Sequence, residues 1–179
     1  DVKLYMDGSN GGIAKTRLVN QGEMVFQGSK NTYIYQNSGN PDAELENNGK
    51  LIKRDSGYTG IGVKLINNGQ IIVDSGSTLA LSSNSIHSGS ASFSGRVVLS
   101  GGTHSFADGF SASGLTEVGG GTVDVSSGNT RFGNMNIATQ IQGNGNLIVA
   151  NASITGGTMT GSGSTILASG GSHTLSGAY

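Results

Sequence analysis

Short clusters of apolar residues, many of them β-branched, alternate along the chain with glycine, asparagine, aspartate and serine. Examples of these clusters are Leu51-Ile52, Ile71-Ile72-Val73, Val97-Val98-Leu99, Leu147-Ile148-Val149 and Thr165-Ile166-Leu167. β-branched residues between turn-forming residues are typical of short strands. No segment carries apolar residues at the helical period over ten or more positions. The pattern therefore predicts an all-β protein with essentially no helix.

The strands and turns recur at a regular spacing. Gly49, Gly69 and Gly89 are equally spaced, and Asn48 and Asn68 immediately precede the first two. A second series of turn glycines follows downstream at Gly102, Gly121 and Gly157. Glycine permits positive φ at tight bends, and asparagine hydrogen-bonds to its own backbone there. These eight residues are therefore predicted to form the structural turns and side-chain ladders.

A coil of three short strands explains this repeat, whereas antiparallel hairpins do not, although Asn-Gly pairs also suit hairpin turns. The glycine spacings indicate about 18–20 residues per coil of a parallel β-helix. Stacked coils place like residues on like, so we expect Asn67 above Asn47 and Ile71 above Leu51. Because one coil cannot bury its apolar face alone, stability is expected to come from stacking.

Charge and aromatic content divide the chain into two parts of one domain. Residues 1–45 are rich in charged and aromatic side chains and are expected to form an irregular N-terminal coil that caps the solenoid. Residues 46–179 are expected to form the regular coils. No charged residue occurs from Phe132 to Tyr179. Few charges there oppose edge-to-edge pairing, so this end is expected to contact another copy or further coils of the same long chain.

Composition excludes several classes of protein. Glycine makes up 32 of the 179 residues, but the recurring apolar clusters and a net charge of −1 argue against a disordered chain. Cysteine is absent, so disulfides and thiolate metal sites are excluded. No apolar run approaches the roughly 20 residues that span a bilayer, so no membrane insertion is expected. Near-neutral charge without a basic patch argues against nucleic acid as a partner.

Several segments resemble the repeats of large bacterial surface and secreted proteins. One is Ile66-Asn67-Asn68-Gly69-Gln70-Ile71-Ile72-Val73-Asp74-Ser75-Gly76-Ser77-Thr78-Leu79-Ala80-Leu81; others are residues 47–53, 99–106, 120–125 and 154–163. These repeats are similar to autotransporter passengers and filamentous adhesins with a pectin-lyase-like fold. The resemblance covers about residues 45–177 and implies a right-handed parallel β-helix at the cell surface or in a secreted protein. It transfers no catalytic residues, and a function assigned from it is an analogy.

Pectin-lyase-like folds also include polysaccharide lyases and hydrolases, whose chemistry needs clustered carboxylates. The acids after residue 60 are spread singly, at Asp74, Asp108, Glu117 and Asp124. Among the histidines, His87, His104 and His173, none is paired at short spacing, and His104 and His173 each lie two positions after a turn glycine, which fits a surface position. The sequence therefore predicts no enzyme, no metal site and no cofactor.

Carbohydrate binding remains open, because sugars stack on exposed aromatic side chains. Tryptophan is absent, which leaves Tyr33, Tyr35 and Tyr58 as candidates for glycan contacts. The first hypothesis is a non-catalytic structural module, a rigid rod in an extracellular adhesin or surface filament that associates with itself end to end. The alternatives are a carbohydrate-binding module of a surface protein and a lyase-like or hydrolase-like domain.

Overall fold

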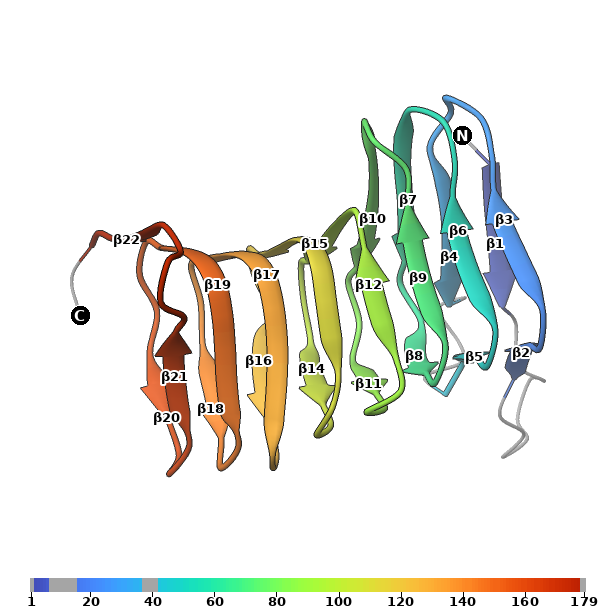
Figure 1. The fold of residues 1–179 in the computed structure, drawn as a ribbon. Coiled ribbons are helices and arrows are strands. Elements are labelled where there is room, and N and C mark those ends of the chain that lie inside the picture. Colours follow the sequence, from blue (N-terminus) through green and yellow to red (C-terminus); the bar gives the residue numbers. More distant parts are fainter. Residues whose placement is uncertain (1, 7–15, 37–41, 178–179) are drawn as a thin grey trace.

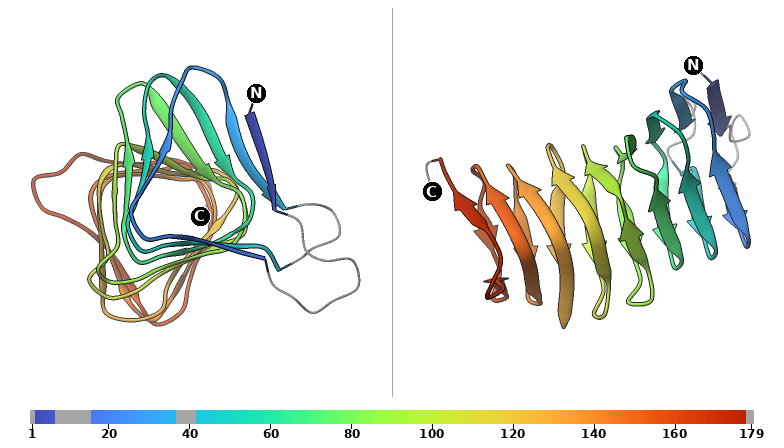
Figure 2. Two further views of the ribbon diagram at one scale, coloured as in Figure 1. Left: turned by 90° about the vertical axis from the view of Figure 1, so that its right-hand side faces the viewer. Right: turned by 45° about the horizontal axis from the view of Figure 1, so that its top comes forward.

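The computed structural model describes residues 2–6, 16–36 and 42–177, and every regular element within them is a β-strand. The chain winds into a right-handed solenoid of about 7 turns (Figures 1 and 2). Neighbouring strands pair in parallel, and the first and last strands lie at opposite ends of a rod. With about 4.8 Å between strands, about 7 turns give a rod roughly 34 Å long. The predicted parallel β-helix is confirmed.

Each coil contributes one strand to each of three faces, which we call A, B and C in chain order. Face A holds β1 (Val2–Met6), β4 (Thr32–Gln36), β7 (Gly57–Ile61), β10 (Ser77–Leu81), β13 (Arg96–Leu99), the second parts of β15 (Ser111–Val118), β17 (Asn129–Ile137) and β19 (Asn146–Ile154), and β22 (His173–Leu175). Face B holds β2 (Arg17–Asn20), β5 (Glu44–Asn47), β8 (Lys64–Asn67), β11 (Ser85–His87), β14 (Thr103–Phe106), β16 (Thr122–Val125), β18 (Ile141–Gly143) and β20 (Met159–Thr160). Face C holds β3 (Glu23–Phe26), β6 (Lys50–Lys53), β9 (Gln70–Val73), β12 (Ser92–Ser94), the first parts of β15, β17 and β19, and β21 (Ser164–Leu167).

The strands that cross from face C to face A join these two faces into one sheet of 14 strands, while face B forms a separate sheet of eight. In β15 the crossing is marked by a register shift against β17 between Ala112 and Leu115. The corner therefore continues the strand instead of interrupting it with a turn. This connection is confined to β15, β17 and β19, in the C-terminal half of the rod (Figure 1).

The length of a coil is read from residues in register on face B. From β5 onward these are Leu45, Leu65, Ser85, His104, Val123, Ile141 and Met159. The step from each of these residue numbers to the next falls along the rod from 20 to 19 and then to 18, so the predicted coil length is confirmed. Leu18 and Leu45 are also in register, and the first coil between them is longer than the rest. The predicted division at residue 45 falls inside β5, and it stays a prediction.

Inward-facing side chains stack into columns along the axis. The column on face A is aliphatic throughout and consists of Leu4, Ile34, Ile61, Leu81, Leu99, Val118, Ile137, Ile154 and Leu175. The column on face C consists of Met24, Leu51, Ile71, Phe93, Ala112, Phe132, Val149 and Leu167. Ile71 therefore lies above Leu51 in an adjacent parallel rung, as predicted, and both are fully buried.

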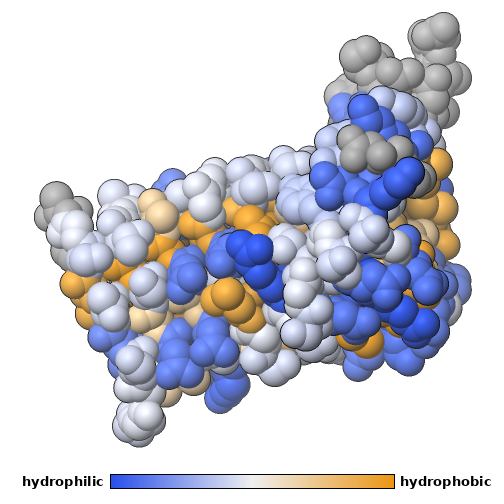
Figure 3. Space-filling view, turned by 90° about the horizontal axis from the view of Figure 1, so that it is seen from above, coloured by the Kyte–Doolittle hydropathy of each residue, from blue (hydrophilic) through white to orange (hydrophobic). Residues whose placement is uncertain are grey.

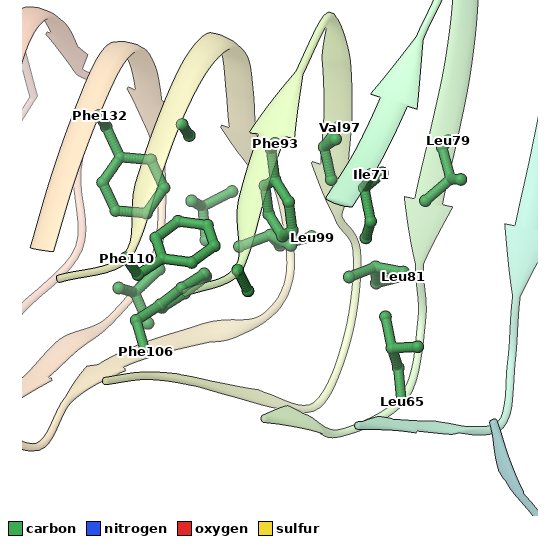
Figure 4. Packing of buried hydrophobic residues seen from close by; sticks show 14 of the residues in the cluster. Leu65, Ile71, Leu79, Leu81, Phe93, Val97, Leu99, Phe106, Phe110 and Phe132 are labelled. Carbon is green, nitrogen blue, oxygen red and sulfur yellow. The ribbon is translucent and has the colours of Figure 1, made fainter. Parts of the chain in front are cut away.

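Aromatic rings fill the middle of the rod, where the coils begin to shorten. Phe93, Phe106, Phe110 and Phe132 come from different strands and turns and meet inside the solenoid (Figure 4). The ring centroids of Phe106 and Phe110 are 4.7 Å apart, and those of Phe93 and Phe110 are 4.9 Å apart in an edge-to-face arrangement. Aromatic pairs at these distances contribute beyond their buried area. The core is thus continuous from rung to rung through the middle of the rod.

Candidate functional site

The predicted turn residues lie at the corners between faces. Asn48-Gly49, Asn68-Gly69 and Gly89 lie between faces B and C, whereas Gly102, Gly121 and Gly157 lie between faces A and B. A Cβ at Gly49 would overlap the carbonyl oxygen of Gly22, and one at Gly69 would overlap the carbonyl oxygen of Gly49. Gly102 and Gly157 have positive φ, and a Cβ at Gly121 would lie 2.9 Å from the ring of His104.

Two asparagine ladders run along the corner between faces B and C. The inner one is buried: Asn20 Nδ2 donates to Asn47 Oδ1, and Asn47 Nδ2 donates to Asn67 Oδ1, each at 2.7 Å. Asn47 Nδ2 also donates to the carbonyl of Gln70 at 3.2 Å. The outer ladder is exposed, with Asn68 Nδ2 donating to Asn48 Oδ1 at 2.8 Å. The predicted stacking of Asn67 on Asn47 is confirmed.

The inner ladder ends at Asn67, because His87 occupies the next position of the column. Asn67 Nδ2 finds no acceptor among the described residues, since an imidazole ring replaces the amide oxygen that would continue the ladder. The ring of His87 instead stacks on Phe106, with centroids 4.7 Å apart and planes at 15°. The column thus changes from polar amides to aromatic rings at this rung.

Ser85 joins two buried histidines inside the rod. Its Oγ lies 2.7 Å from Nε2 of His87 and 2.7 Å from Nδ1 of His104. All three side chains are buried, so His104 is not at the surface position that the sequence suggested, and it lies on face B whereas His173 lies on face A. The signal that was missed is the sequence spacing between Ser85 and His104, which equals one coil and places them in one column.

Burial keeps these histidines neutral. Removal from water, and to a smaller extent the neighbouring His104, lowers the pKa of His87 well below its ordinary value of 6.5. Burial lowers the pKa of His104 to about 4. A serine between two imidazoles resembles the parts of a catalytic site, but no substrate reaches residues that are at most 1% exposed. We therefore assign the three side chains a structural role.

The structure brings together the three tyrosines that were predicted as glycan contacts. They project from neighbouring strands of face A, Tyr33 and Tyr35 from β4 and Tyr58 from β7, and Tyr5 of β1 joins them. The rings of Tyr33 and Tyr35 are nearly parallel at 10°, with centroids 5.2 Å apart. Tyr5 lies 6.4 Å from Tyr35, and Tyr58 lies 5.8 Å from Tyr33.

These distances determine which parts of the tyrosine rings are exposed to water. Two parallel rings only 5.2 Å apart cover one another's faces, because coplanar rings side by side need more room. They also lean over the end of β7: a Cβ at Gly60 would lie 2.9 Å from a ring carbon of Tyr33, and a Cβ at Gly62, just after the strand, 2.9 Å from a ring carbon of Tyr35. Burial, with a smaller effect of the other two phenols, raises the pKa of Tyr58. Tyrosine side chains thus cover glycine positions of the sheet and present mainly their edges to water.

The acids that a lyase or hydrolase reading would use face different sides of the rod. Glu117 lies on face A, where its Oε2 pairs with Arg96 at 2.7 Å. Asp124 lies on face B and accepts hydrogen bonds from two serine hydroxyls. Asp108 lies at the corner between faces B and C, and its Oδ1 accepts from the backbone N–H of Asn129 at 2.7 Å. Paired carboxylates about 5–10 Å apart across one substrate are the usual hydrolase arrangement, and these three acids are not arranged in that way.

Within the described ranges, no group of three or more histidine, aspartate or glutamate side chains is placed to hold a metal ion. Nor does that part of the chain contain a helix with the length and hydropathy of a membrane span.

The ends of the rod are the most unusual part of its surface. Of eight exposed large hydrophobic side chains among the described residues, four lie on the first strands and three on the last. On β1–β3 they are Leu4, Tyr5, Val19 and Val25, and on β20–β22 they are Met159, Ile166 and Leu175. Figure 3 shows hydrophobic residues at both ends of the rod and also along the middle of the face in view. Only Ile86 lies in the middle of it. Among the described residues, exposed large apolar side chains are therefore concentrated on the first and last strands.

Comparison with known proteins finds no family, no curated protein and no solved structure that matches the chain. The structure itself shows the solenoid, and the proposed setting at a bacterial surface depends on the resemblance of its repeats.

We predict that Gly49→Ala destabilises the rod by about 2 kcal/mol, because its Cβ would overlap the carbonyl oxygen of Gly22 and overpacking typically costs about 1–3 kcal/mol. Urea unfolding monitored by circular dichroism measures the change. Gly22→Ala is the matched control, since a Cβ there meets nothing within 4 Å. Equal losses in the two variants would contradict the role of stacked corner glycines.

We predict that Asn47→Ala lowers the free energy of unfolding by about 3 kcal/mol, because it leaves the buried Oδ1 of Asn67 and the carbonyl of Gln70 without this donor. Asn48→Ala removes only exposed hydrogen bonds, one in the outer ladder and one to Glu46 Oε1, and should change stability by less than about 1 kcal/mol. The midpoints of urea unfolding compare the two adjacent positions. Similar midpoints would show that the inner ladder adds nothing.

We predict that acid destabilises the protein between pH 6.5 and about pH 4, because the unfolded chain then protonates His104 while the folded chain does not. The stability that neutral His104 contributes is therefore fully present above pH 6.5. Its pKa of about 4 corresponds to a free energy of unfolding that is about 3 kcal/mol lower at pH 4. Urea titrations at a series of pH values measure the slope. His104→Gln should make this slope shallower, and the part that remains comes from the buried His87; a slope unchanged from that of the wild type would refute the assignment.

Proposed function

We propose that this chain is a non-catalytic structural module of an extracellular bacterial adhesin or surface filament, in which it forms a length of rigid rod. The observation that carries the proposal is the continuity of the core columns. The column on face A is apolar in every rung from Leu4 to Leu175, and no rung interrupts it. A fold whose core is continuous along its axis is suited to form a long rod that bears mechanical load.

Contacts between neighbouring coils supply the stiffness. Backbone hydrogen bonds join each rung to the next, as between Asp74 N and Lys53 O at 2.9 Å. Ion pairs join rungs in the N-terminal half: Lys50 with Glu23 at 3.0 Å and Lys64 with Glu44 at 2.8 Å. Because these bonds run along the axis, bending or stretching the rod strains many of them together. The rod is thus expected to transmit force with little change of length.

A location outside the cell is supported by the repeats and the composition. The segments that resemble surface and secreted repeat proteins form strands and corners of several coils of this solenoid. Its partners would then be further coils of the same long chain or other copies of it. This setting is an analogy from the repeats, so it needs a direct test.

The alternatives have less support in the geometry. A carbohydrate-binding module would use the tyrosines of face A, but the rings of Tyr33 and Tyr35 cover each other instead of offering open faces for sugar stacking. A polysaccharide lyase or hydrolase would use carboxylates that converge on one cleft, whereas Asp108, Glu117 and Asp124 face different sides. Both remain alternatives to the structural role.

Immunogold labelling of intact and permeabilised cells of the source organism, with antibodies against this chain, tests the proposal. Gold particles on the surface of intact cells are expected, and treating those cells with external protease should remove the label. A cytoplasmic protein of known location is the control for cell integrity. Label that appears only after permeabilisation would overturn the surface function.

A further inference from the structure

Buried polar groups without partners gather at one rung in the middle of the rod. Seven buried side-chain nitrogen or oxygen atoms of the described residues make no hydrogen bond, and three of them are Asn67 Nδ2, His87 Nδ1 and His104 Nε2. These three side chains surround Ser85, whose Oγ lies 2.7 Å from His87 Nε2 and 2.7 Å from His104 Nδ1. Because an unsatisfied buried polar group destabilises the folded chain, this rung is a weak point of the stack.

The strands of this rung also pair over few residues. β11 has three residues and pairs with β14 over that length, and β12 has three residues as well. In the coils that follow, β15, β17 and β19 have eight or nine residues each. Each coil of a solenoid is held mainly by its immediate neighbours, so a weak contact can open while the coils on either side stay folded.

The hydroxyl of Ser85 fixes where protons lie in the neutral cluster. A hydroxyl has one hydrogen to donate and lone pairs that accept, and a neutral imidazole carries a proton on only one of its nitrogens. One of the two nitrogens that face Oγ therefore carries a proton and donates to it. The other is unprotonated and accepts from the hydroxyl. Both short contacts are satisfied in this way as long as the rings are neutral.

Added protons change this balance in two steps. An imidazolium ring has an N–H donor on both nitrogens. With one ring charged, that ring donates to Oγ and the hydroxyl donates to the neutral ring. With both rings charged, both nitrogens donate to Oγ, the hydroxyl hydrogen loses its acceptor, and two positive charges lie on either side of one buried oxygen. The closed cluster therefore accommodates one added proton but not two.

No carboxylate among the described residues offsets a charge inside this cluster. The rings that contact His87 are uncharged and belong to Phe93, Phe106 and Phe110. The strands β9, β10 and β12 carry no charged residue. The charged side chains of β8, β13, β15 and β16 and of the corner after β14 are engaged at the surface of the rod: Lys64, Arg96, Glu117, Asp124 and Asp108. Histidine is thus the only titratable group that faces either ring.

The pKa values agree with this geometry and give the direction of the effect. Burial and, to a smaller extent, His104 lower the pKa of His87, and burial lowers the pKa of His104 to about 4. Rings released into water regain a pKa of about 6.5. The closed cluster is therefore fully stable above pH 6.5 and loses stability as the pH falls toward 4, because the open form then binds more protons.

We propose that Ser85, His87 and His104 form an acid-operated joint, in which the uptake of two protons separates β11 from β14 and opens the rod at this rung while the coils on both sides stay stacked. Loss of the protons restores the shared hydroxyl and closes the joint. This inference goes beyond the proposed function, because it concerns the solenoid itself and holds wherever the protein is located.

Amide hydrogen exchange of the full chain, resolved by residue with NMR between pH 7 and pH 4, tests the joint. The amide of Ala107 donates to the carbonyl of His87 and reports the joint, whereas the amides of Asn68 and Thr155 report the coils on either side. After correction for intrinsic rates, the opening constant at Ala107 should rise at least about 100-fold from pH 6.5 to pH 4, which is the contribution of His104 alone.

The comparison of the three amides decides whether the opening is local. At pH 5 the opening constant at Ala107 should exceed those at Asn68 and Thr155 by at least about ten-fold, because the joint opens without the rest of the rod. Equal opening constants at all three amides would mean that the rod unfolds as a whole, and the joint would be refuted.

The number of protons separates a coupled joint from a single titrating ring. The slope of the logarithm of the Ala107 opening constant against pH counts the protons taken up on opening. Near pH 5 it should approach two in the wild type and one in His87→Gln or His104→Gln. Ile86→Gln changes the exposed side chain between Ser85 and His87 and should keep the slope of two. A wild-type slope of one would overturn the proposal even where a histidine variant fails to fold.

The nitrogen chemical shifts of the imidazole rings at pH 7 test the shared hydroxyl directly. One of His87 Nε2 and His104 Nδ1 should be protonated and the other unprotonated, because a single hydroxyl joins them. If neither of these nitrogens carried a proton, the hydroxyl would bond to one ring only, and the proton count that the joint depends on would be wrong.

Discussion

Hydrogen bonds between consecutive coils run along the axis of the rod and hold each residue above the residue one coil earlier. The surroundings of a side chain are therefore set mainly by the positions one coil before and one coil after it, and less by its neighbours in sequence. Leu51 is buried because Ile71 covers it, and Asn47 can be buried because Asn20 and Asn67 satisfy its amide. One ladder thus decides both which residues are apolar and which polar residues are tolerated inside.

The inner column of face B shows the effect of a change in residue type from one coil to the next. Three asparagines share hydrogen bonds along the axis, and the series stops where His87 follows Asn67. The imidazole leaves the Asn67 amide without an acceptor but begins a stack of rings with Phe106. The unsatisfied amide has a cost, and the aromatic contacts around His87 offset it. His87 is buried and neutral because it lies where the asparagine ladder meets the stack of aromatic rings.

The sequence predicts the solenoid, the coil length and the stacking of residues 47–71, because the period there is constant. Downstream the period shortens, but Gly102, Gly121 and Gly157 stay in register. Gly171 instead lies at the corner between faces C and A, so its alignment with Gly102 wrongly grouped His104 with His173. Ser85, one coil earlier, holds His104 inside. The strands that cross from face C to face A were not predicted either, since a register shift in β15 leaves no clear sequence signal.

Side-chain geometry on the surface was the least predictable part. The alternation in residues 32–35 identifies outward tyrosines, and the structure gathers them with Tyr5 and Tyr58. Whether rings lie flat or stand against each other depends on the strand beneath them. Gly60 of β7 and Gly62 just after it leave space that Tyr33 and Tyr35 lean into, so the rings pair instead of forming an open platform. A glycine one coil away thus decides what an aromatic residue offers to a ligand.

A fold built from one repeated contact has no intrinsic last rung, because the final coil presents the same columns and the same backbone edge as every coil before it. Charged side chains protect strand edges in many proteins, and here the outward charges of β2 and β3 are engaged with the following rung by ion pairs. The C-terminal coils have no charges at all. The described coils are therefore stable only as a stack, because each rung buries its apolar side chains against the rungs before and after it.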